Sequence, residues 1–189
     1  MKTAISALIF IGIVFGGYFI LRNDTVEDEA GFDYKNTSYI IDGEKVTLVN
    51  GVSETPIKNS AASVVTRFFG NELFTDLDGD GDEDVAFILT QETGGSGTFF
   101  YAVAALSTEK GYVGTHDAYF LGDRIAPQST NVSPNLRHKY VVVFNYADRA
   151  EGQSMSEQPS EGKSVYLKLV PESRQWAIVE PDFEGESAF

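Results

Sequence analysis

Cysteine is absent from this sequence of 189 residues, and histidine occurs only twice. A chain without cysteine has no disulfide, no thiolate zinc site and no cysteine nucleophile. Basic residues are also scarce, because 14 Lys and Arg stand against 28 Asp and Glu, for a formal net charge of −14. Nucleic-acid binding needs clustered Lys and Arg, so this balance argues against nucleic acid as a partner.

Apolar residues, in contrast, are plentiful. Hydrophobic residues make up 42% of the chain and aromatic residues 13%, which excludes intrinsic disorder for most of it. The length fits one ordinary domain with short appendages, not two full domains. The sequence therefore predicts a single folded domain with a net negative charge that is compatible with bound cations.

The N-terminus carries one long uncharged run of 19 residues, from Thr3 to Leu21. As a helix this run would extend roughly 28 Å, close to the ~30 Å of a bilayer's hydrocarbon core. Lys2 precedes the run, and Arg22 and a group of acidic residues follow it. We therefore expect residues 1–22 to form a transmembrane anchor, with Lys2 in the cytoplasm and the rest of the chain outside it.

A cleaved signal peptide is the alternative for this segment. The bulky residues that close the apolar run, Tyr18 to Leu21, fit a small-x-small cleavage site poorly, which favours the anchor. Both alternatives place the domain outside the cytoplasm, in the cell envelope or at the surface. Gly12 and Gly16 form a G-x-x-x-G pair, which offers a homo-oligomer contact, although glycine is also simply common in membrane helices.

Beyond the anchor, residues 23–37 are interpreted as an acidic tether and residues 38–189 as the extracytoplasmic domain. The domain shows period-two alternation with turn residues between the runs, which is typical of strands. Asp42-Gly43 is a favoured two-residue hairpin turn, and Asn50-Gly51 marks the next turn. Val64 to Thr75 has helix-capping signals, but its β-branched and aromatic residues favour a strand.

The pattern thus predicts a mostly β fold: a single antiparallel β domain, sandwich or meander-like, with about seven to nine strands and room for one short helix. The strand candidates are Tyr39–Ile41, Val46–Val49, Val64–Thr75, Val85–Thr90, Thr98–Leu106, Ala118–Leu121, Tyr140–Tyr146, Ser164–Val170 and Gln175–Val179.

Residues 76–84 carry the strongest chemical signal, with five Asp and one Glu in nine residues. Like charges this close repel one another, and a divalent cation relieves the repulsion. Calcium accepts six to eight hard oxygen ligands, and alternating Asp in a tight loop directs carboxylates at one centre. Gly81 permits the sharp turn. The predicted calcium ligands are Asp76, Asp78, Asp80, Asp82 through its backbone carbonyl, and Asp84.

The position of the last carboxylate ligand distinguishes two classes of calcium-binding loop. An EF-hand places a bidentate Glu at position 12, but here that position is Phe87, inside an apolar run typical of a strand. Asp84 at position 9 therefore closes the site. The loop resembles the D-x-D-G-D-G-x-x-D loops of integrin-α-like FG-GAP repeats, over Phe69 to Leu89. The resemblance implies a calcium ion in a turn between strands, with the ligands named above.

Only one copy of this loop occurs, so an FG-GAP propeller, which needs several blades, is excluded. Magnesium fits less well, since its rigid octahedron prefers waters and few carboxylates. An acidic, solvated turn that binds nothing remains the other alternative. Further stretches, such as Val46 to Gly51, Gly122 to Pro127 and Asn145 to Arg149, resemble a group of small exported or membrane-anchored bacterial proteins.

Three further features of the sequence are weaker signals. The stretch between Asp148 and Lys163 has almost no large apolar residue and predicts a long exposed loop. Asp123-Arg124 and Asp148-Arg149 are acid–base pairs that suit either a polar cleft or structural salt bridges. The consecutive aromatics Phe99 to Tyr101 suit either a strand buried on both faces or a ring shown to solvent.

These patterns favour a membrane-anchored, extracytoplasmic calcium-binding β domain that acts without catalysis, as an envelope interaction or structural module with a possible envelope protein partner. An accessory subunit of a larger membrane complex is one alternative. The other is a calcium-dependent hydrolase of envelope polymers, although no nucleophile–base set points to an enzyme. Its candidate carboxylates are Glu72, Glu92, Asp117, Asp148 and Glu151.

Overall fold

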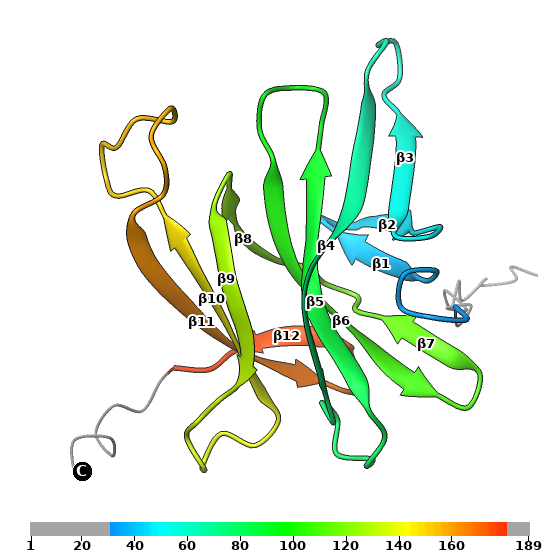
Figure 1. The fold of residues 1–189 in the computed structure, drawn as a ribbon. Coiled ribbons are helices and arrows are strands. Elements are labelled where there is room, and N and C mark those ends of the chain that lie inside the picture. Colours follow the sequence, from blue (N-terminus) through cyan, green and yellow to red (C-terminus); the bar gives the residue numbers. More distant parts are fainter. Residues whose placement is uncertain (1–30, 181–189) are drawn as a thin grey trace, which may run out of the picture.

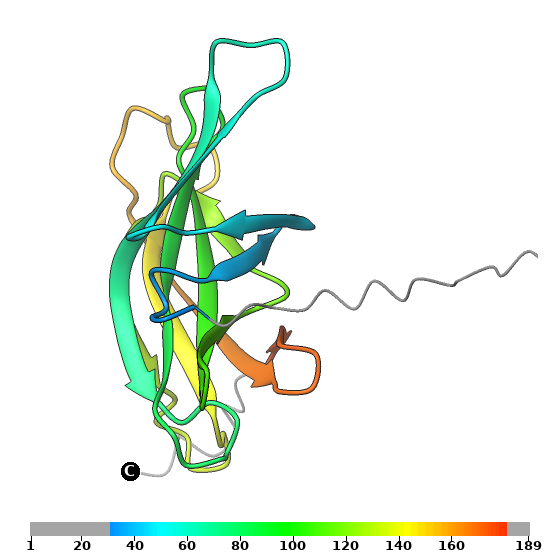
Figure 2. The same cartoon turned by 90° about the vertical axis from the view of Figure 1, so that its right-hand side faces the viewer.

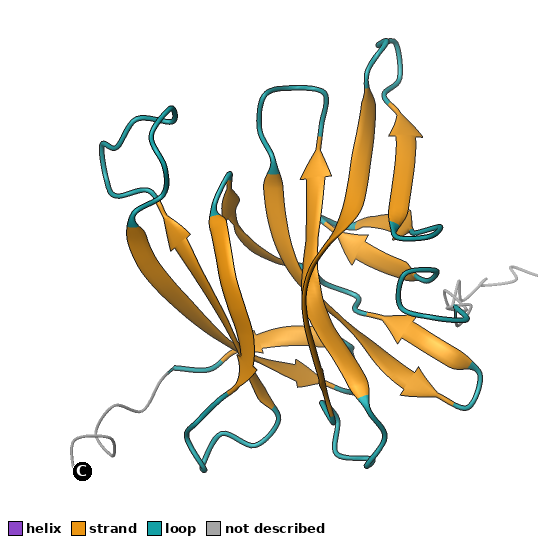
Figure 3. Ribbon diagram, in the orientation of Figure 1, coloured by secondary structure: helices purple, strands orange, loops and turns teal. Residues whose placement is uncertain are grey.

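The computed structural model describes residues 31–180, which form twelve β-strands and no helix (Figure 3). The predicted mostly β fold with antiparallel pairing is confirmed. The strands are β1 Ser38–Ile41, β2 Glu44–Thr47, β3 Val52–Pro56, β4 Ser63–Thr75, β5 Asp84–Glu92, β6 Phe99–Thr108, β7 Gly111–Gly114, β8 Tyr119–Asp123, β9 Ala126–Val132, β10 Val141–Asp148, β11 Glu161–Val170 and β12 Gln175–Ile178.

The predicted anchor, residues 1–22, lies outside the described residues, and so does the Gly12/Gly16 pair. Within residues 31–180, no helix is long and apolar enough to cross a bilayer.

The strands follow one another as meanders in three sheets. Six strands form the largest sheet, in the order β3-β4-β5-β6-β7, with β8 paired to β6 beside the β7 end of the sheet. A four-stranded sheet has the order β12-β11-β10-β9, and β1 and β2 form a separate hairpin. Apart from β8, which pairs with β6, every strand pairs with a strand adjacent in sequence, which explains why short turn signals recur along the chain.

The three sheets stack as layers around two cores. One face of the six-stranded sheet packs against the four-stranded sheet, and Ile88, Phe144 and Leu167 are buried between them. The opposite face packs against the β1–β2 hairpin, where Tyr39 and Phe87 are completely buried. Figures 1 and 2 show the hairpin standing off one face of the large sheet.

Strands β5 and β6 are buried on both faces because they lie in the middle layer. In β5, Val85, Phe87 and Leu89 face the hairpin, while the alternate residues Ala86 and Ile88 face the four-stranded sheet. This position explains the unbroken apolar run after the acidic loop, since a strand covered on both sides has no polar face.

The β1–β2 hairpin confirms the predicted Asp42-Gly43 turn. Both residues have positive φ, 52° and 83°, as a type I′ turn requires. Asn50 and Gly51 repeat this conformation with φ of 52° and 79°. The predicted strand over Val64 to Thr75 is also confirmed, as part of β4.

Twelve strands form where about seven to nine were expected, so the predicted count is wrong. The strands without a sequence prediction are β3, β7 and β9, each at a sheet edge. An edge strand can expose most of its side chains, and β3 has four exposed residues out of five. Such a strand needs no apolar alternation, which removes the signal on which the prediction relied.

Part of the predicted tether packs against the domain. The ring of Tyr34 lies 5.4 Å from that of Phe87 and 5.8 Å from that of Tyr112, centroid to centroid. Gly31 forms a backbone bridge with Tyr112, and Thr37 is 3% exposed. Residues 31–37 therefore belong to the folded domain and not to a solvated linker.

Candidate metal centre

The acidic loop connects β4 to β5, and the backbone pairing of Thr75 with Asp84 closes its two ends. Gly79 and Gly81 have φ of 90° and 94°, in the left-handed region that favours glycine. The sharp turn that the sequence assigned to Gly81 is therefore present. A strand–turn–strand frame also separates this loop from an EF-hand, in which a helix follows the loop.

Hydrogen bonds within the loop organise its carboxylates. Asp76 Oδ1 accepts from the backbone N–H of Gly79 at 2.6 Å, and Asp78 Oδ1 accepts from that of Asp80 at 3.1 Å. Asp80 Oδ1 accepts from the N–H of Asp82 at 2.8 Å. Each carboxylate thus uses one oxygen to fix the turn, as short polar side chains do in tight turns, and keeps the other oxygen for another partner.

Three of the five aspartates converge. Carboxylate oxygens of Asp76, Asp78 and Asp84, one from each residue, all lie within 4.8 Å of one another. Two oxygens bound to the same calcium ion at about 2.4 Å can be separated by at most about 4.8 Å. The spacing of this triad would allow one metal ion to contact all three carboxylates, and among the described residues this is the group with that geometry.

Asp84 is the buried member of the triad, with no exposed surface. Its Oδ2 accepts from the N–H of Leu77 and its Oδ1 from the N–H of Ser107, both at 2.8 Å. Burial nevertheless raises the pKa of this carboxyl to about 6, because the two hydrogen bonds offset only part of the lost hydration. Burial also raises the pKa of Asp78. The loop therefore holds negative charge that is poorly compensated by the protein itself.

The other two predicted ligands lie outside the triad. Asp80 and Asp82 are exposed, and the side chain of Asp80 caps the N–H of Asp82. Asp82 was predicted to bind calcium through its backbone carbonyl, so the exposure of its side chain does not test that prediction. Asp80 differs, because its carboxylate would have to turn inward to join Asp76, Asp78 and Asp84.

No sequence pattern indicated the residues that support the loop from outside it. Ser107 belongs to β6 and reaches Asp84 only because β5 and β6 pair. Tyr140 lies against Gly79, where an added Cβ would meet its hydroxyl at 3.1 Å. No local sequence pattern could indicate either contact, since both join segments that are far apart in the chain.

The carboxylates proposed for a hydrolase have other partners or are exposed. Glu72 accepts from the Tyr34 hydroxyl at 2.9 Å and pairs with Lys35 at 3.3 Å. Asp148 pairs with Lys163 at 2.8 Å, and this contact lowers the pKa of the carboxyl. A general acid needs a raised pKa, so the environment of Asp148 is opposite to that role. Glu92, Asp117 and Glu151 are exposed.

The two arginine pairs have structural partners. Arg124 pairs with Asp123 at 2.9 Å, which lowers the pKa of Asp123. Arg149 donates through Nη1 to the carbonyl of Arg124 at 2.8 Å and through Nη2 to that of Glu157 at 2.9 Å. Arg149 thereby fastens the loop between β10 and β11, residues 149–160, to the end of β8.

Replacing Arg149 with lysine is expected to release this loop. Lysine keeps the positive charge but lacks the fork that donates to two carbonyls at once. Hydrogen bonds from a charged donor contribute about 1.5–3 kcal/mol, so hydrogen exchange of the loop amides should rise at least about tenfold. Exchange in β5 should stay unchanged. Equal protection of the loop in both proteins would show that Arg149 does not hold it.

No protein-family model, curated protein or solved structure matched this chain in the comparisons made with it.

Proposed function

We propose that this protein is a membrane-anchored, extracytoplasmic calcium-binding β domain that acts as an interaction or structural module of the cell envelope, without catalysis. The apolar run from Thr3 to Leu21 supports the anchor and the location. The acidic loop supports the ion. A partner in the envelope would meet the domain through an exposed surface, such as the loop that Arg149 fastens.

The observation that carries the calcium proposal is the triad of Asp76, Asp78 and Asp84, whose oxygens lie within 4.8 Å while Asp84 is fully buried. A buried carboxylate near two others is costly without a cation. The remaining coordination positions of a calcium ion would be filled by water, by the carbonyl of Asp82 and by Asp80 once its side chain turns inward.

Calcium bound here would stabilise the fold. The ion would tie the β4–β5 loop to Asp84 at the start of β5, and Asp84 is already bonded to Ser107 of β6. A ligand that binds only the folded state raises stability by mass action, by about 2.7 kcal/mol at a concentration of 100 times the Kd. For a chain without cysteine, such an ion takes the place that a disulfide holds in many exported domains.

The test is a thermal melt of the full chain with calcium and with a chelator. We expect calcium near 100 times its Kd to raise the Tm by roughly 5–10 °C. Magnesium at the same concentration should raise it less, because Mg²⁺ prefers to keep its waters. An unchanged Tm, after metal analysis has shown that chelation emptied the protein, would contradict the proposal.

Three single substitutions locate the ion. Asp78→Asn keeps the acceptor for the Asp80 N–H but removes one charge of the triad, so calcium affinity should fall at least about tenfold. Asp82→Asn is the matched control, since it removes the same charge from an exposed side chain and should change affinity less than about threefold. Asp80→Asn reports whether Asp80 joins the site: a loss like that of Asp78→Asn means that it does.

A further inference from the structure

A cavity of about 380 Å³ opens on the hairpin side of the six-stranded sheet, and no function proposed above uses it. Its volume falls in the range of roughly 300–1,000 Å³ that is typical of small-ligand sites. The cavity is lined by Asp42, Gln91, Thr93, Phe99, Tyr101 and Phe120.

The cavity exists because the β1–β2 hairpin is shorter than the sheet it covers. Tyr39 and Ile41 of the hairpin cover Phe87 and Leu89, but the hairpin then turns at Asp42. Beyond that turn the same sheet face continues through Gln91 of β5, which pairs with Phe99 of β6. The turn of the hairpin therefore forms one wall of the cavity, and the uncovered part of the sheet forms its floor.

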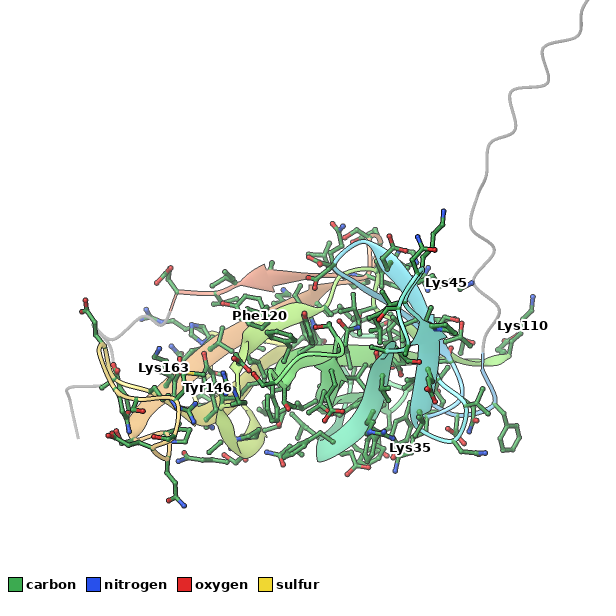
Figure 4. All side chains as sticks on the ribbon, turned by 90° about the horizontal axis from the view of Figure 1, so that it is seen from above. Lys35, Lys45, Lys110, Phe120, Tyr146 and Lys163 are labelled. Atoms are coloured by element: carbon green, nitrogen blue, oxygen red, sulfur yellow. The ribbon has the colours of Figure 1, made fainter. Side chains whose placement is uncertain are left out.

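Three aromatic rings line this space at an angle to one another. The ring of Phe120 lies 5.5 Å from that of Tyr101 and 6.3 Å from that of Phe99, with interplanar angles of 54° and 50°. Phe120 is 50% exposed, so part of its ring is open to solvent. Figure 4 labels it among the side chains. A cation is attracted to the face of an aromatic ring within about 6 Å of its centroid, so a cavity lined by several rings offers such a position.

A carboxylate lies beside the rings. Asp42 accepts through Oδ2 from the Tyr101 hydroxyl at 2.7 Å, and this bond fixes the carboxylate at the mouth of the cavity. Burial and Asp42 together raise the pKa of Tyr101, so the phenol keeps its proton and remains the donor.

Nearby basic residues do not neutralise Asp42. Arg124, which follows β8, is paired with Asp123. Lys45 lies opposite Ile40 on the other face of the hairpin from Tyr39 and Ile41. The labelled Lys35, Lys45 and Lys110 all lie well apart from Phe120 in Figure 4. The cavity therefore combines aromatic faces with a carboxylate that has no cationic partner among the described residues.

We propose that the cavity lined by Asp42, Phe99, Tyr101 and Phe120 binds an organic cation, an alkylammonium group that lies against the rings and pairs with Asp42. Anionic ligands are disfavoured because the wall carries a carboxylate and the chain is strongly acidic. Asp42 is exposed, so water solvates its charge, and a neutral sugar would gain no ion pair from it. The alkylammonium group belongs either to a small quaternary amine or to a lysine side chain of a protein partner.

This site is separate from the acidic loop. Asp84 and Gln91 stand at opposite ends of β5, roughly 20 Å apart at about 3.3 Å per residue. Binding of an organic cation therefore requires no calcium, and its failure would leave the calcium proposal intact.

The experiment is a titration of the full chain, followed by NMR shifts or calorimetry, in a buffer free of amines. The probes are choline, its uncharged carbon isostere 3,3-dimethylbutan-1-ol, and the peptide acetyl-Gly-Lys-Gly-amide. We expect choline or the lysine peptide to bind at least about tenfold more tightly than the neutral alcohol. The tighter of the two cations identifies the source of the ammonium group.

Variants test the two parts of the site. Asp42→Asn keeps an acceptor for Tyr101 and suits the left-handed turn position, so the fold should persist while cation affinity falls roughly tenfold. Asp117→Asn removes the same charge from an exposed position outside the cavity and should have no effect. Phe120→Leu keeps apolar bulk without a π face and should weaken binding about threefold or more.

Three results would overturn the proposal. The first is equal affinity for choline and its neutral isostere. The second is unchanged cation affinity in Asp42→Asn. The third is a site that takes a neutral disaccharide such as cellobiose but neither cation, which would identify a sugar site instead.

Discussion

Replacing Phe87 with alanine is expected to lower the free energy of unfolding by about 3–5 kcal/mol. Phe87 lies in the middle of β5 with no exposed surface. Its ring lies 5.5 Å from that of Phe68, 5.6 Å from that of Tyr39 and 5.4 Å from that of Tyr34. The three neighbours come from β4, from β1 and from the segment before β1, so none can move into the space without shifting its own strand.

Chemical denaturation of the wild type and the variant measures this loss. Phe87→Leu retains much of the volume and should cost no more than about 1.5 kcal/mol, which keeps the test interpretable if the alanine variant fails to fold. Phe74→Ala is the control, because Phe74 is 44% exposed and contacts Tyr34 by its edge. Equal losses for Phe74→Ala and Phe87→Ala would mean that the hairpin layer contributes little to stability.

The second large effect is a pH dependence that reverses when calcium binds. In the metal-free protein the folded-state pKa of Asp84, about 6, exceeds its ordinary value of 3.8. The folded state therefore holds this proton more tightly than the unfolded state does. The contribution of this group to the free energy of unfolding is therefore largest below pH 3.8. It falls as the pH rises from 3.8 to about 6 and is absent above that range. The shift corresponds to about 3 kcal/mol.

With a chelator present, the chain should therefore be more stable at pH 5 than at pH 7.5. With calcium present the order should reverse, since the ion binds the carboxylate and protons compete with it. Asp123 and Asp148 have lowered pKa values, so their contribution is lost only as pH falls below the usual range of a carboxyl group. They do not affect the comparison between pH 5 and pH 7.5.

Melts at the two pH values, each with calcium and with chelator, measure the effect. Asp82→Asn should retain the dependence, because this side chain is exposed. Asp84→Asn should lose most of it and keep only the part due to Asp78, whose pKa burial also raises. The amide gives up one of the acceptors for Leu77 and Ser107 and so lowers stability at every pH. A metal-free protein whose stability does not fall between pH 5 and pH 7.5 would falsify the assignment of a buried, costly charge to Asp84.

The central strands and hairpin turns were predictable because their signals are local. Asp42-Gly43 specifies a type I′ turn from two residues, and the apolar run Val85 to Leu89 specifies a strand buried on both faces. The edge strands β3, β7 and β9 were not predictable, since strands that are exposed or short need no apolar alternation. Residues 31–37 were assigned to the tether because Phe32 and Tyr34 are the only aromatics among mostly polar residues, and no local pattern shows that Tyr34 packs against Phe87.

The sequence by itself determined the class of the fold, the acidic character of the domain, and the place of the acidic loop between two strands. Only the tertiary structure decided which aspartates converge, since Asp84 is buried by the pairing of β5 with β6. It alone also placed Asp42 beside Tyr101, which is 59 residues away in the chain. The physical reason is that turns and strand periodicity are properties of neighbouring residues. Burial and converging charge depend on contacts between distant segments, which no local pattern encodes.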